Sequence, residues 1–469
     1  MKKLGIILTL IFLSLVGIHF FLAPKNDEFL HETHINRSDS EVPGYCCDVT
    51  KITDKHTLHW YNEYFDRVDE ECGYAWNYNW DADRKQMNMT KAIAKEKGPE
   101  FIAEAFSNSP PYFMTNSGCT SGATDSSQNN LRDDSYNAFA KYLADVIAHI
   151  NEEDNGITFT SATGMNEPYA DYWGANSNKQ EGCHVDQGYA QSRIIEALNW
   201  NLQDKGVTNC IVSGTDETSI DTAIDSYNAL TDGGKNTISR IDTHTYGGTK
   251  RYELCQLAEN EGKNLWVSEV DGDFTAGTDA EEMSAALGLA QHIIIDLNWL
   301  KPSAWILWNI ADMHCDTGNI HDSDDISWLN TWGGYWGLAV CNHDDEYIWC
   351  LKKYYAFGQF TRYIRPGHTI FPISDNAVGA YDGIEHKVVI VAINTDNWDK
   401  TCQFSFEQFS DMSSTAVTAI RTSGSLDGGE NWTDVSTLCN IYIDINSKYF
   451  NSILKANSIT TYIINDVIY

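Results

Sequence analysis

Ile157-Thr-Phe-Thr-Ser-Ala-Thr163 is a short, largely apolar run that leads directly into Gly164-Met-Asn-Glu-Pro168. A run of this length that ends at a turn signal predicts a buried β-strand. Further runs of the same kind follow along the chain, at 101–106, 210–213, 241–244, 265–268 and 304–308. Strands of a parallel sheet are covered on both faces and therefore read as nearly continuous apolar runs. We expect these segments to be neighbouring strands of such a sheet.

Amphipathic segments separate the expected strands. Asp133 or Asp134 can cap a helix whose apolar face carries Phe139, Leu143, Val146, Ile147 and Ile150. A second helix is expected from near Thr278, with its apolar face formed by Met283, Leu287, Ala290, Ile294 and Leu297. The alternation predicts βαβ units, in a (β/α)8 barrel or an open doubly wound sheet. No Gly-x-Gly-x-x-Gly or phosphate loop follows a strand, which disfavours a nucleotide-binding open sheet.

The pattern changes after Arg365-Pro-Gly367. Short alternating segments such as Thr401-Cys-Gln-Phe-Ser-Phe-Glu407 are separated by Gly, Ser and Asn, which predicts an antiparallel β-sandwich. We therefore expect a hydrophobic segment at 1–23, a barrel domain at 24–367 and a β-sandwich domain at 368–469.

Composition limits the possible partners. The net charge of −34 repels nucleic acid, so no nucleic-acid partner is expected. The 15 Trp and 24 Tyr residues suit a carbohydrate binder, although most aromatic side chains serve as ordinary core residues.

The N-terminus has the layout of an export signal. Met1-Lys-Lys3 precedes an apolar run over 5–23 that lacks an Ala-x-Ala step at its end. An uncleaved membrane anchor formed by 5–23 is the alternative. Either reading predicts a secreted protein or one anchored at the cell surface.

Two carboxylates end expected strands. Glu167 follows the strand at 157–163, and Glu269 closes the strand at 265–268. Side chains at the carboxyl ends of barrel strands converge on one site, and glycoside hydrolysis needs a proton donor with a raised pKa beside an ionised nucleophile. The plainer reading of each Glu is an ion-pair partner or a helix cap. A Ser-His-Asp mechanism has less support, because no Gly-x-Ser-x-Gly is present.

From about Pro24 onward the chain resembles glycoside hydrolase family 30, and within it the endo-β-1,6-galactanases. The segments that carry the resemblance are Asn77–Asp83 (NYNWDAD), Glu104–Gly118 (EAFSNSPPYFMTNSG), Asn166-Glu-Pro168, Gln180-Glu-Gly-Cys-His184, Asp216-Glu217, Trp266-Val-Ser-Glu269 and Lys353–Gly367 (KYYAFGQFTRYIRPG). The resemblance implies a retaining (β/α)8-barrel glycosidase with a C-terminal β-sandwich. It makes Glu167, at the end of barrel strand four, the acid/base, and Glu269, at the end of strand seven, the nucleophile.

The same resemblance implies a set of substrate contacts. Asn166, beside the acid, can bind the sugar 2-hydroxyl. Tyr246 follows strand six near the nucleophile, and Trp308 ends strand eight as a sugar platform. Loop residues on the same face complete the set: Asn108, Trp173, Glu181, Asp216 and His244. Ordinary barrel packing is the alternative role for Trp173 and Trp308.

The start of the chain departs from the family. Only six barrel strands are visible, and strands one and two are unaccounted for, so the expected fold is a (β/α)8 barrel lacking its first two strands. Either the chain begins at a false start and lacks its true N-terminus, or it is a degenerate copy with an open barrel. We expect the chain as written to be unstable or weakly active. We expect no cofactor, a monomer, and β-1,6-galactan as the polysaccharide substrate. The alternatives are a xylanase, glucosidase or glucosylceramidase specificity, or a galactan-binding protein without catalysis.

Overall fold

The computed structural model describes residues 13–14, 84–97, 101–152, 157–175, 177, 180–271, 283–313, 337–342 and 347–469. Residues 24–83, with the expected match at 77–83, lie outside this set. The chain divides into two compact units. The first unit holds the described residues between Ile11 and Lys250 together with Gln256–Asn264, and the second holds Arg251–Cys255 with Leu265–Tyr469. The division falls within helix α8 (Arg251–Asn260).

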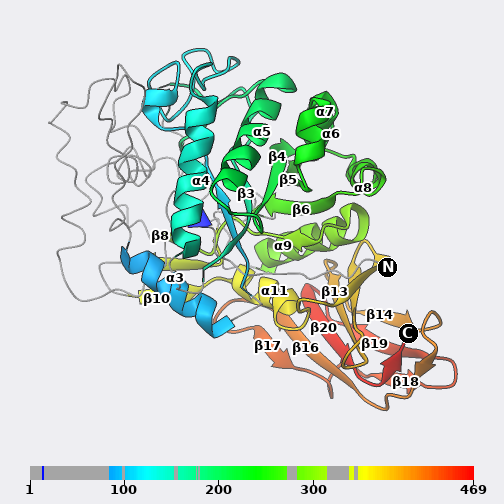
Figure 1. The fold of residues 1–469 in the computed structure, drawn as a ribbon. Coiled ribbons are helices and arrows are strands. Elements are labelled where there is room, and N and C mark those ends of the chain that lie inside the picture. The colour runs from blue at the N-terminus through cyan, green and yellow to red at the C-terminus, as the bar shows by residue number, and fades with distance from the viewer. Residues whose placement is uncertain are drawn as a thin grey trace. The chain divides into compact units, whose positions relative to one another are not determined.

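The first unit is built from parallel strands and the helices that follow them (Figure 1). Its strands are β1 (Leu13–Ser14), β2 (Ala103–Phe106), β3 (Phe159–Thr163), β4 (Ile211–Ser219) and β5 (Arg240–Gly247). Its helices are α3 (Arg84–Lys97), the short 3₁₀ helix η3 (Tyr112–Met114), α4 (Tyr136–Glu152), α5 (Tyr189–Asp204), α6 (Ile220–Ala229) and α7 (Asp232–Thr237). Each strand pairs in parallel with the next in chain order. The unit is therefore part of a (β/α)8 barrel.

Burial explains these elements. Phe139, Leu143, Val146 and Ile147 of α4 are at most 1% exposed, which confirms the predicted apolar face. The interior of the sheet is partly ionic, since Arg240 of β5 lies beside Asp242 and beside Glu104 of β2.

Strand β1 lies within the hydrophobic segment expected at 1–23. Leu13 pairs with Ala105 and Ser14 with Phe106, so β1 lies next to β2, where the preceding barrel strand would run. The rest of segment 1–23 lies outside the described residues, and export or anchoring stays a prediction.

The second unit begins with two more parallel strands, β6 (Asn264–Glu269) and β7 (Ala304–Trp305). Its helical elements are α9 (Met283–Ile295), the π-helical turn η5 (Asp296–Leu300) and α11 (Lys352–Thr361). A small sheet is formed by β8 (Ala311–Met313), β9 (Ala339–Asn342) and β10 (Tyr347–Cys350). Strands β2 to β7 thus supply the six parallel strands that the sequence predicts.

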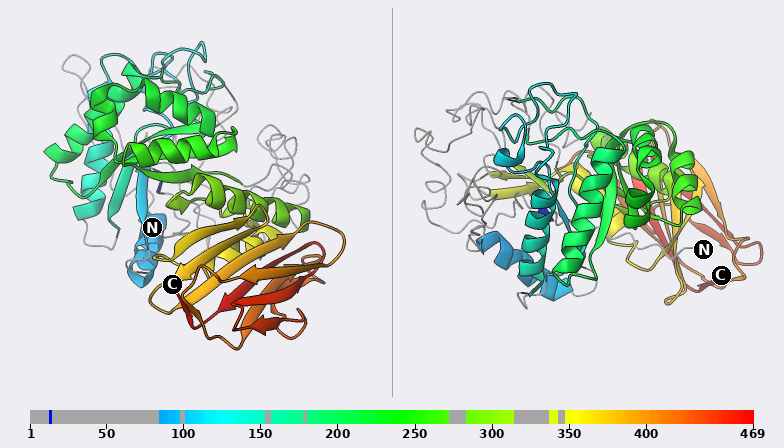
Figure 2. Two further views of the ribbon diagram at one scale, coloured as in Figure 1. Left: turned by 90° about the vertical axis from the view of Figure 1, so that its right-hand side faces the viewer. Right: turned by 45° about the horizontal axis from the view of Figure 1, so that its top comes forward.

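The antiparallel strands begin just after Gly367 and form the predicted β-sandwich (Figures 1 and 2). They are β11 (Thr369–Ser374), β12 (Ala377–Asp382), β13 (Lys387–Asn394), β14 (Lys400–Ser405), β15 (Asp411–Met412), β16 (Val417–Ser423), β17 (Glu430–Asp434), β18 (Tyr442–Asp444), β19 (Tyr449–Leu454), β20 (Ser458–Ile464) and β21 (Val467–Ile468). One sheet has the order β11-β12-β13-β20-β16-β17, and β14-β19-β18 form a second. Val388, Ile390, Phe404, Phe450 and Tyr462 meet in the core of the sandwich.

Helix α11 belongs to the same unit as the sandwich. Lys352 is fully buried, and its ammonium donates to the carbonyl oxygens of Ser423, Ser425 and Glu430. The indole of Trp432 lies against Gly358, where a Cβ would stand 2.0 Å from the ring. The last barrel helix and the sandwich are therefore a single packed body, although the predicted domain boundary at 367 lies between them.

Candidate active site

Glu167 lies in the loop that follows β3, at the carboxyl end of the strand. A Cβ on Gly164 would stand 2.8 Å from Ile194 of α5, so glycine lets the end of the strand pass close to that helix. Glu167 itself has a φ of +46°, in the left-handed region that costs energy for a residue with a side chain. The residue is only 7% exposed. The backbone therefore holds a buried carboxylate in an unusual conformation at the expected position.

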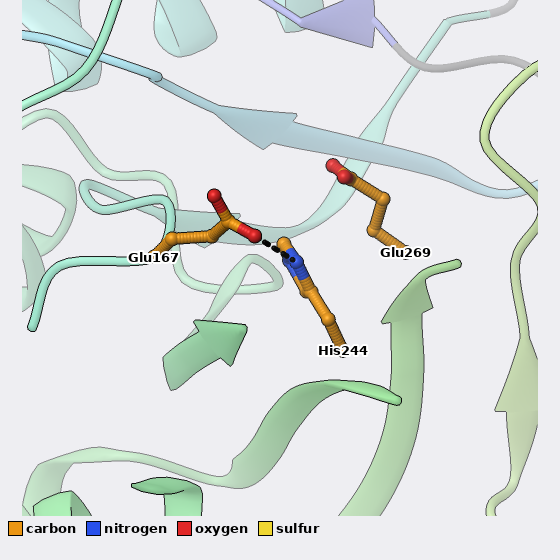
Figure 3. Close-up of side chains that lie close together, drawn as sticks. All are labelled: Glu167, His244 and Glu269. Atoms are coloured by element: carbon orange, nitrogen blue, oxygen red, sulfur yellow. Dashed lines mark hydrogen bonds and ion pairs between the residues drawn. The ribbon is translucent and has the colours of Figure 1, made fainter. Parts of the chain in front are cut away.

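Three side chains contact the carboxylate of Glu167. The hydroxyl of Thr218, from β4, donates to Oε1, and the hydroxyl of Tyr172 donates to Oε2. Nδ1 of His244, from β5, lies 3.2 Å from Oε1 (Figure 3). Burial raises the pKa of Glu167, but the hydrogen bonds from His244, Thr218 and Tyr172 outweigh burial and hold the pKa below its usual value. These donors favour the ionised form of Glu167, whereas the predicted role of proton donor needs the protonated form.

His244 also reaches a second carboxylate. Its Nε2 lies 3.4 Å from Oδ1 of Asp216, and all three side chains are buried. A doubly protonated imidazole can donate to both carboxylates, whereas a neutral one can donate to only one of them. The structure thus brings together three of the predicted residues, Glu167, Asp216 and His244, in an arrangement suited to handling a proton. Carboxylate and imidazole groups are also metal ligands, but both oxygens of Glu167 already accept hydrogen bonds from hydroxyl groups or face the imidazole.

Asn166 is placed to bind a ligand. It is 2% exposed, and neither atom of its side-chain amide has a hydrogen-bond partner within the described part of the chain. Buried amide groups in proteins are nearly always paired, so this amide beside Glu167 can take a partner from outside the described residues.

The other predicted loop residues of the first unit have different surroundings. The amide of Asn108 donates to Oε1 of Glu181 over 2.6 Å, and both side chains are buried. Tyr246 is half-buried, with its ring 5.8 Å from that of His244. Trp173 is 2% exposed, and its indole N–H donates to the carbonyl oxygen of Glu167 over 3.0 Å. This placement of Trp173 suits support of the loop rather than stacking on a sugar.

Glu269 and Trp308 belong to the second unit. Glu269 is the last residue of β6 and is 7% exposed (Figure 3). Trp308 follows β7 and is half-buried, with its backbone N–H donating to the carbonyl oxygen of Val270 over 2.9 Å. Both residues therefore stand at or beyond the carboxyl ends of their strands, as the sequence predicts.

Tyr172 and Thr218 contact Glu167 but are not among the residues that the sequence predicts. Tyr172 precedes the predicted Trp173, and Thr218 lies two residues after Asp216. Their position next to predicted residues on the same loop or strand end was the available signal. Nothing in the residue types themselves distinguishes them from the many other hydroxyl groups of the chain.

The similarity of this chain to known proteins agrees with the fold and the site. The profile described as "O-Glycosyl hydrolase family 30" matches residues 62–242. The endo-β-1,6-galactanase of Hypocrea rufa is 32% identical over 402 residues, which cover 84% of this chain and 74% of the relative. The exo-β-1,6-galactobiohydrolase of Bifidobacterium longum subsp. longum is 25% identical over 67% of this chain and 24% of its own length.

Solved structures support the same fold. A conserved exported protein from Bacteroides fragilis superimposes with a TM-score of 0.63 at 18% identity, over 85% of this chain and 82% of the other. A family 30 subfamily 8 xylanase from Clostridium acetobutylicum gives a TM-score of 0.60 at 20% identity, over 90% of this chain and 94% of the other. The fold and these relatives together define the chain as an O-glycosyl hydrolase. Within that class, the chain belongs to glycoside hydrolase family 30.

Proposed function

We propose that this protein is a retaining endo-hydrolase of β-1,6-galactan, such as the side chains of arabinogalactan. The observation that carries the proposal is the 32% identity to an endo-β-1,6-galactanase over 84% of the chain. The buried carboxylate of Glu167, with its shell of proton donors, supports the chemistry.

In this proposal Glu167 and Glu269 act in two displacements. A carboxylate oxygen of Glu269 attacks the anomeric carbon while Glu167 gives its proton to the departing glycosidic oxygen, so that one C–O bond forms as another breaks. Glu167, now ionised, takes a proton from water, whose oxygen attacks the same carbon and releases Glu269. The product keeps the configuration of the substrate, and no cofactor is required.

The lowered pKa of Glu167 must rise before it can act as an acid. In a retaining pair the ionised nucleophile raises the pKa of the acid by repulsion between like charges, and this effect ends when the covalent intermediate neutralises the nucleophile. Loss of water on substrate binding acts in the same direction. The hydroxyl and imidazole donors then favour the ionised form that the second displacement needs.

The remaining predicted residues serve the substrate in this proposal. The amide of Asn166, which has no partner among the described residues, takes the sugar 2-hydroxyl, where a hydrogen bond strengthens in the transition state. Asn108, Glu181, Asp216, His244, Tyr246 and Trp308 contact the galactan chain, and Trp173 acts through the backbone of Glu167.

Export is part of the proposal. Cys119 is disulfide-bonded, and disulfides persist mainly outside the reducing cytosol. Among the helices the structure describes, none combines the length and apolar character needed to span a bilayer. We propose a monomer acting on polysaccharide outside the cell.

A substrate panel tests the proposal. Purified protein is incubated with β-1,6-galactan, glucuronoxylan and β-1,6-glucan, and the reducing ends and product lengths are measured. Release of short galacto-oligosaccharides from the galactan is expected, and Glu269→Gln should abolish it while leaving the melting temperature within a few degrees. Cleavage of xylan alone would give the xylanase specificity found among the similar solved structures. Binding to galactan without any cleavage would favour the non-catalytic alternative.

A further inference from the structure

Two backbone N–H groups around Glu167 are held by consecutive residues of β4. The N–H of Glu167 donates to the carbonyl oxygen of Asp216 over 2.8 Å. The N–H of Tyr169 donates to Oε2 of Glu217 over 3.1 Å. Glu167 and Asp216 both have positive φ, +46° and +59°. Left-handed residues that carry side chains persist only where their surroundings hold them, so this pair of contacts restrains an unfavourable backbone.

The carboxylate of Glu217 is tied to two helices as well as to the loop. Its Oε1 accepts from Nε2 of Gln191, in α5, over 2.9 Å and from the hydroxyl of Ser226, in α6, over 2.6 Å. Ser226 in turn accepts from Nε2 of Gln187 over 2.8 Å, which directs its own proton toward Glu217. The side chain of Glu217 thus joins the loop after Glu167 to the helices behind it.

All three hydrogen-bond partners of Glu217 are neutral donors. The residue is 1% exposed, and burial raises its pKa to about 7 in spite of these hydrogen bonds. A carboxyl group buried among neutral partners is costly, and glutamine of the same shape would avoid that cost. Only a carboxylate can accept at both oxygens from three donors, because a glutamine amide would turn its NH₂ toward one of them.

We infer that Glu217 is a positioning residue that fixes the backbone of the Asn166–Tyr169 loop and thereby aims the acid/base Glu167. The inference rests on the proposed function. Glu217 does not reach the carboxylate of Glu167 itself. It acts through the Tyr169 N–H, two residues after Glu167, while the adjoining Asp216 carbonyl holds the N–H of Glu167.

Glu217→Gln tests the inference through the dependence of rate on the leaving group. A misplaced acid slows hydrolysis of substrates whose leaving group needs a proton, such as β-1,6-galactan. It has little effect on hydrolysis of an aryl galactobioside with a dinitrophenyl leaving group, which departs without a proton. We expect kcat/KM to fall about 100-fold on galactan, within the range of general acid catalysis, and about fivefold or less on the aryl substrate. Equal losses on both substrates, or no loss on either, would overturn the inference.

Two matched variants support this reading. Asp145→Asn removes a half-buried carboxylate of α4 that pairs with Lys141 and Lys205, and should leave the leaving-group dependence unchanged. Ser226→Ala removes one donor from Glu217 and should show a smaller defect of the same kind. If Glu217→Gln does not fold, Ser226→Ala replaces it as the test. Its kcat/KM should fall more on galactan than on the aryl substrate, and equal losses would overturn the inference.

Failure of the proposed function has a different signature. Glu167→Gln, measured in parallel, must show the same leaving-group dependence more strongly, and if it does not, the acid/base assignment fails. Hydrogen exchange of the Tyr169 amide gives a readout that needs no activity: protection should fall in Glu217→Gln. Unchanged protection at Tyr169 would overturn the positioning role even in an inactive enzyme.

Discussion

At the residue scale, the surroundings of one carboxylate determine its chemistry. Thr218 and Tyr172 each donate a hydroxyl to Glu167, and the two hydroxyls also contact each other over 2.8 Å. Such donors stabilise the ionised carboxylate and oppose the burial that would protonate it. These donors therefore favour the ionised form of Glu167, which the second displacement of the proposed mechanism needs.

Thr218→Val removes one donor at nearly constant volume and should raise the pKa of Glu167. Activity that depends on protonated Glu167 falls as pH rises through this pKa, so the basic limb of kcat/KM should move upward. A hydrogen bond to a charged group contributes about 1.5 kcal/mol or more, which corresponds to a shift of about one pH unit. A pH profile measures the shift, with Thr218→Ser as the control that keeps the hydroxyl. A basic limb that stays in place or moves to lower pH would show that Thr218 does not stabilise the ionised form.

A substitution at Gly182 tests whether packing of Trp173 holds the backbone of Glu167 in place. A Cβ at this position would stand 2.1 Å from the ring of Trp173, whose indole holds the carbonyl oxygen of Glu167. Gly182→Ala should therefore shift Trp173, lower kcat at least tenfold and destabilise the fold by about 1–3 kcal/mol. Gly174→Ala, on the same loop, meets no described residue within 4 Å and should be close to neutral. Thermal melting and galactan turnover measure both variants, and equal behaviour of the two would refute the packing role.

Part of this site can be predicted from the sequence. Glu167, Asp216 and His244 could be named because they stand at strand ends within recognisable segments. The donors on Glu167 could not, because Tyr172 and Thr218 come from a loop and a strand end whose meeting depends on the left-handed turns at Glu167 and Asp216. Such turns are set by tertiary contacts and leave no local sequence signal.

At the element scale, the interior of the parallel strands carries charge. The guanidinium of fully buried Arg240 contacts the carboxylates of Glu104 and Asp242 and the hydroxyls of Ser161 and Ser213. Burial raises the pKa of Glu104 to about 8 although Arg240 opposes it. Apolar periodicity predicts these strands but not their ionic interior, because Glu104 lies on β2 whereas Arg240 and Asp242 lie on β5, and their contact depends on how the strands are arranged.

Arg240→Met should destabilise the protein strongly, because it leaves two buried carboxylates without their cation. Breaking a buried ion pair in this way costs about 3–5 kcal/mol. Arg193→Met is the control, since Arg193 pairs with Asp133 at the surface and such pairs contribute about 0–1 kcal/mol. Urea unfolding at neutral pH compares the two. Similar losses of unfolding free energy in both variants would contradict the structural role of the Arg240 cluster.

At the scale of the whole molecule, the sequence predicts a barrel that ends at 367 and a separate sandwich. The parallel strands of the first part and the antiparallel strands of the second are confirmed. Helix α11, however, packs against the sandwich through Lys352, Gly358 and Gln359. These are polar or small residues that pattern analysis assigns to a surface, so the sequence could not reveal this packing.

Truncation after Gly367 should therefore fail to give a stable enzyme. It would uncover the buried side chains of α11, including Lys352, whose ammonium would lose its carbonyl partners on the sandwich. We expect the shortened chain to aggregate or to melt without a cooperative transition, as followed by circular dichroism and size-exclusion chromatography. A soluble, cooperatively folded chain with full galactan turnover would show that the sandwich is dispensable.

The proposed function is hydrolysis of β-1,6-galactan with retention of configuration. Proton NMR of a fresh digest resolves the anomeric signals of the new reducing ends before they equilibrate. We expect the β-anomer to appear first and the α-anomer to follow by mutarotation. Initial appearance of the α-anomer would contradict the double displacement by Glu167 and Glu269.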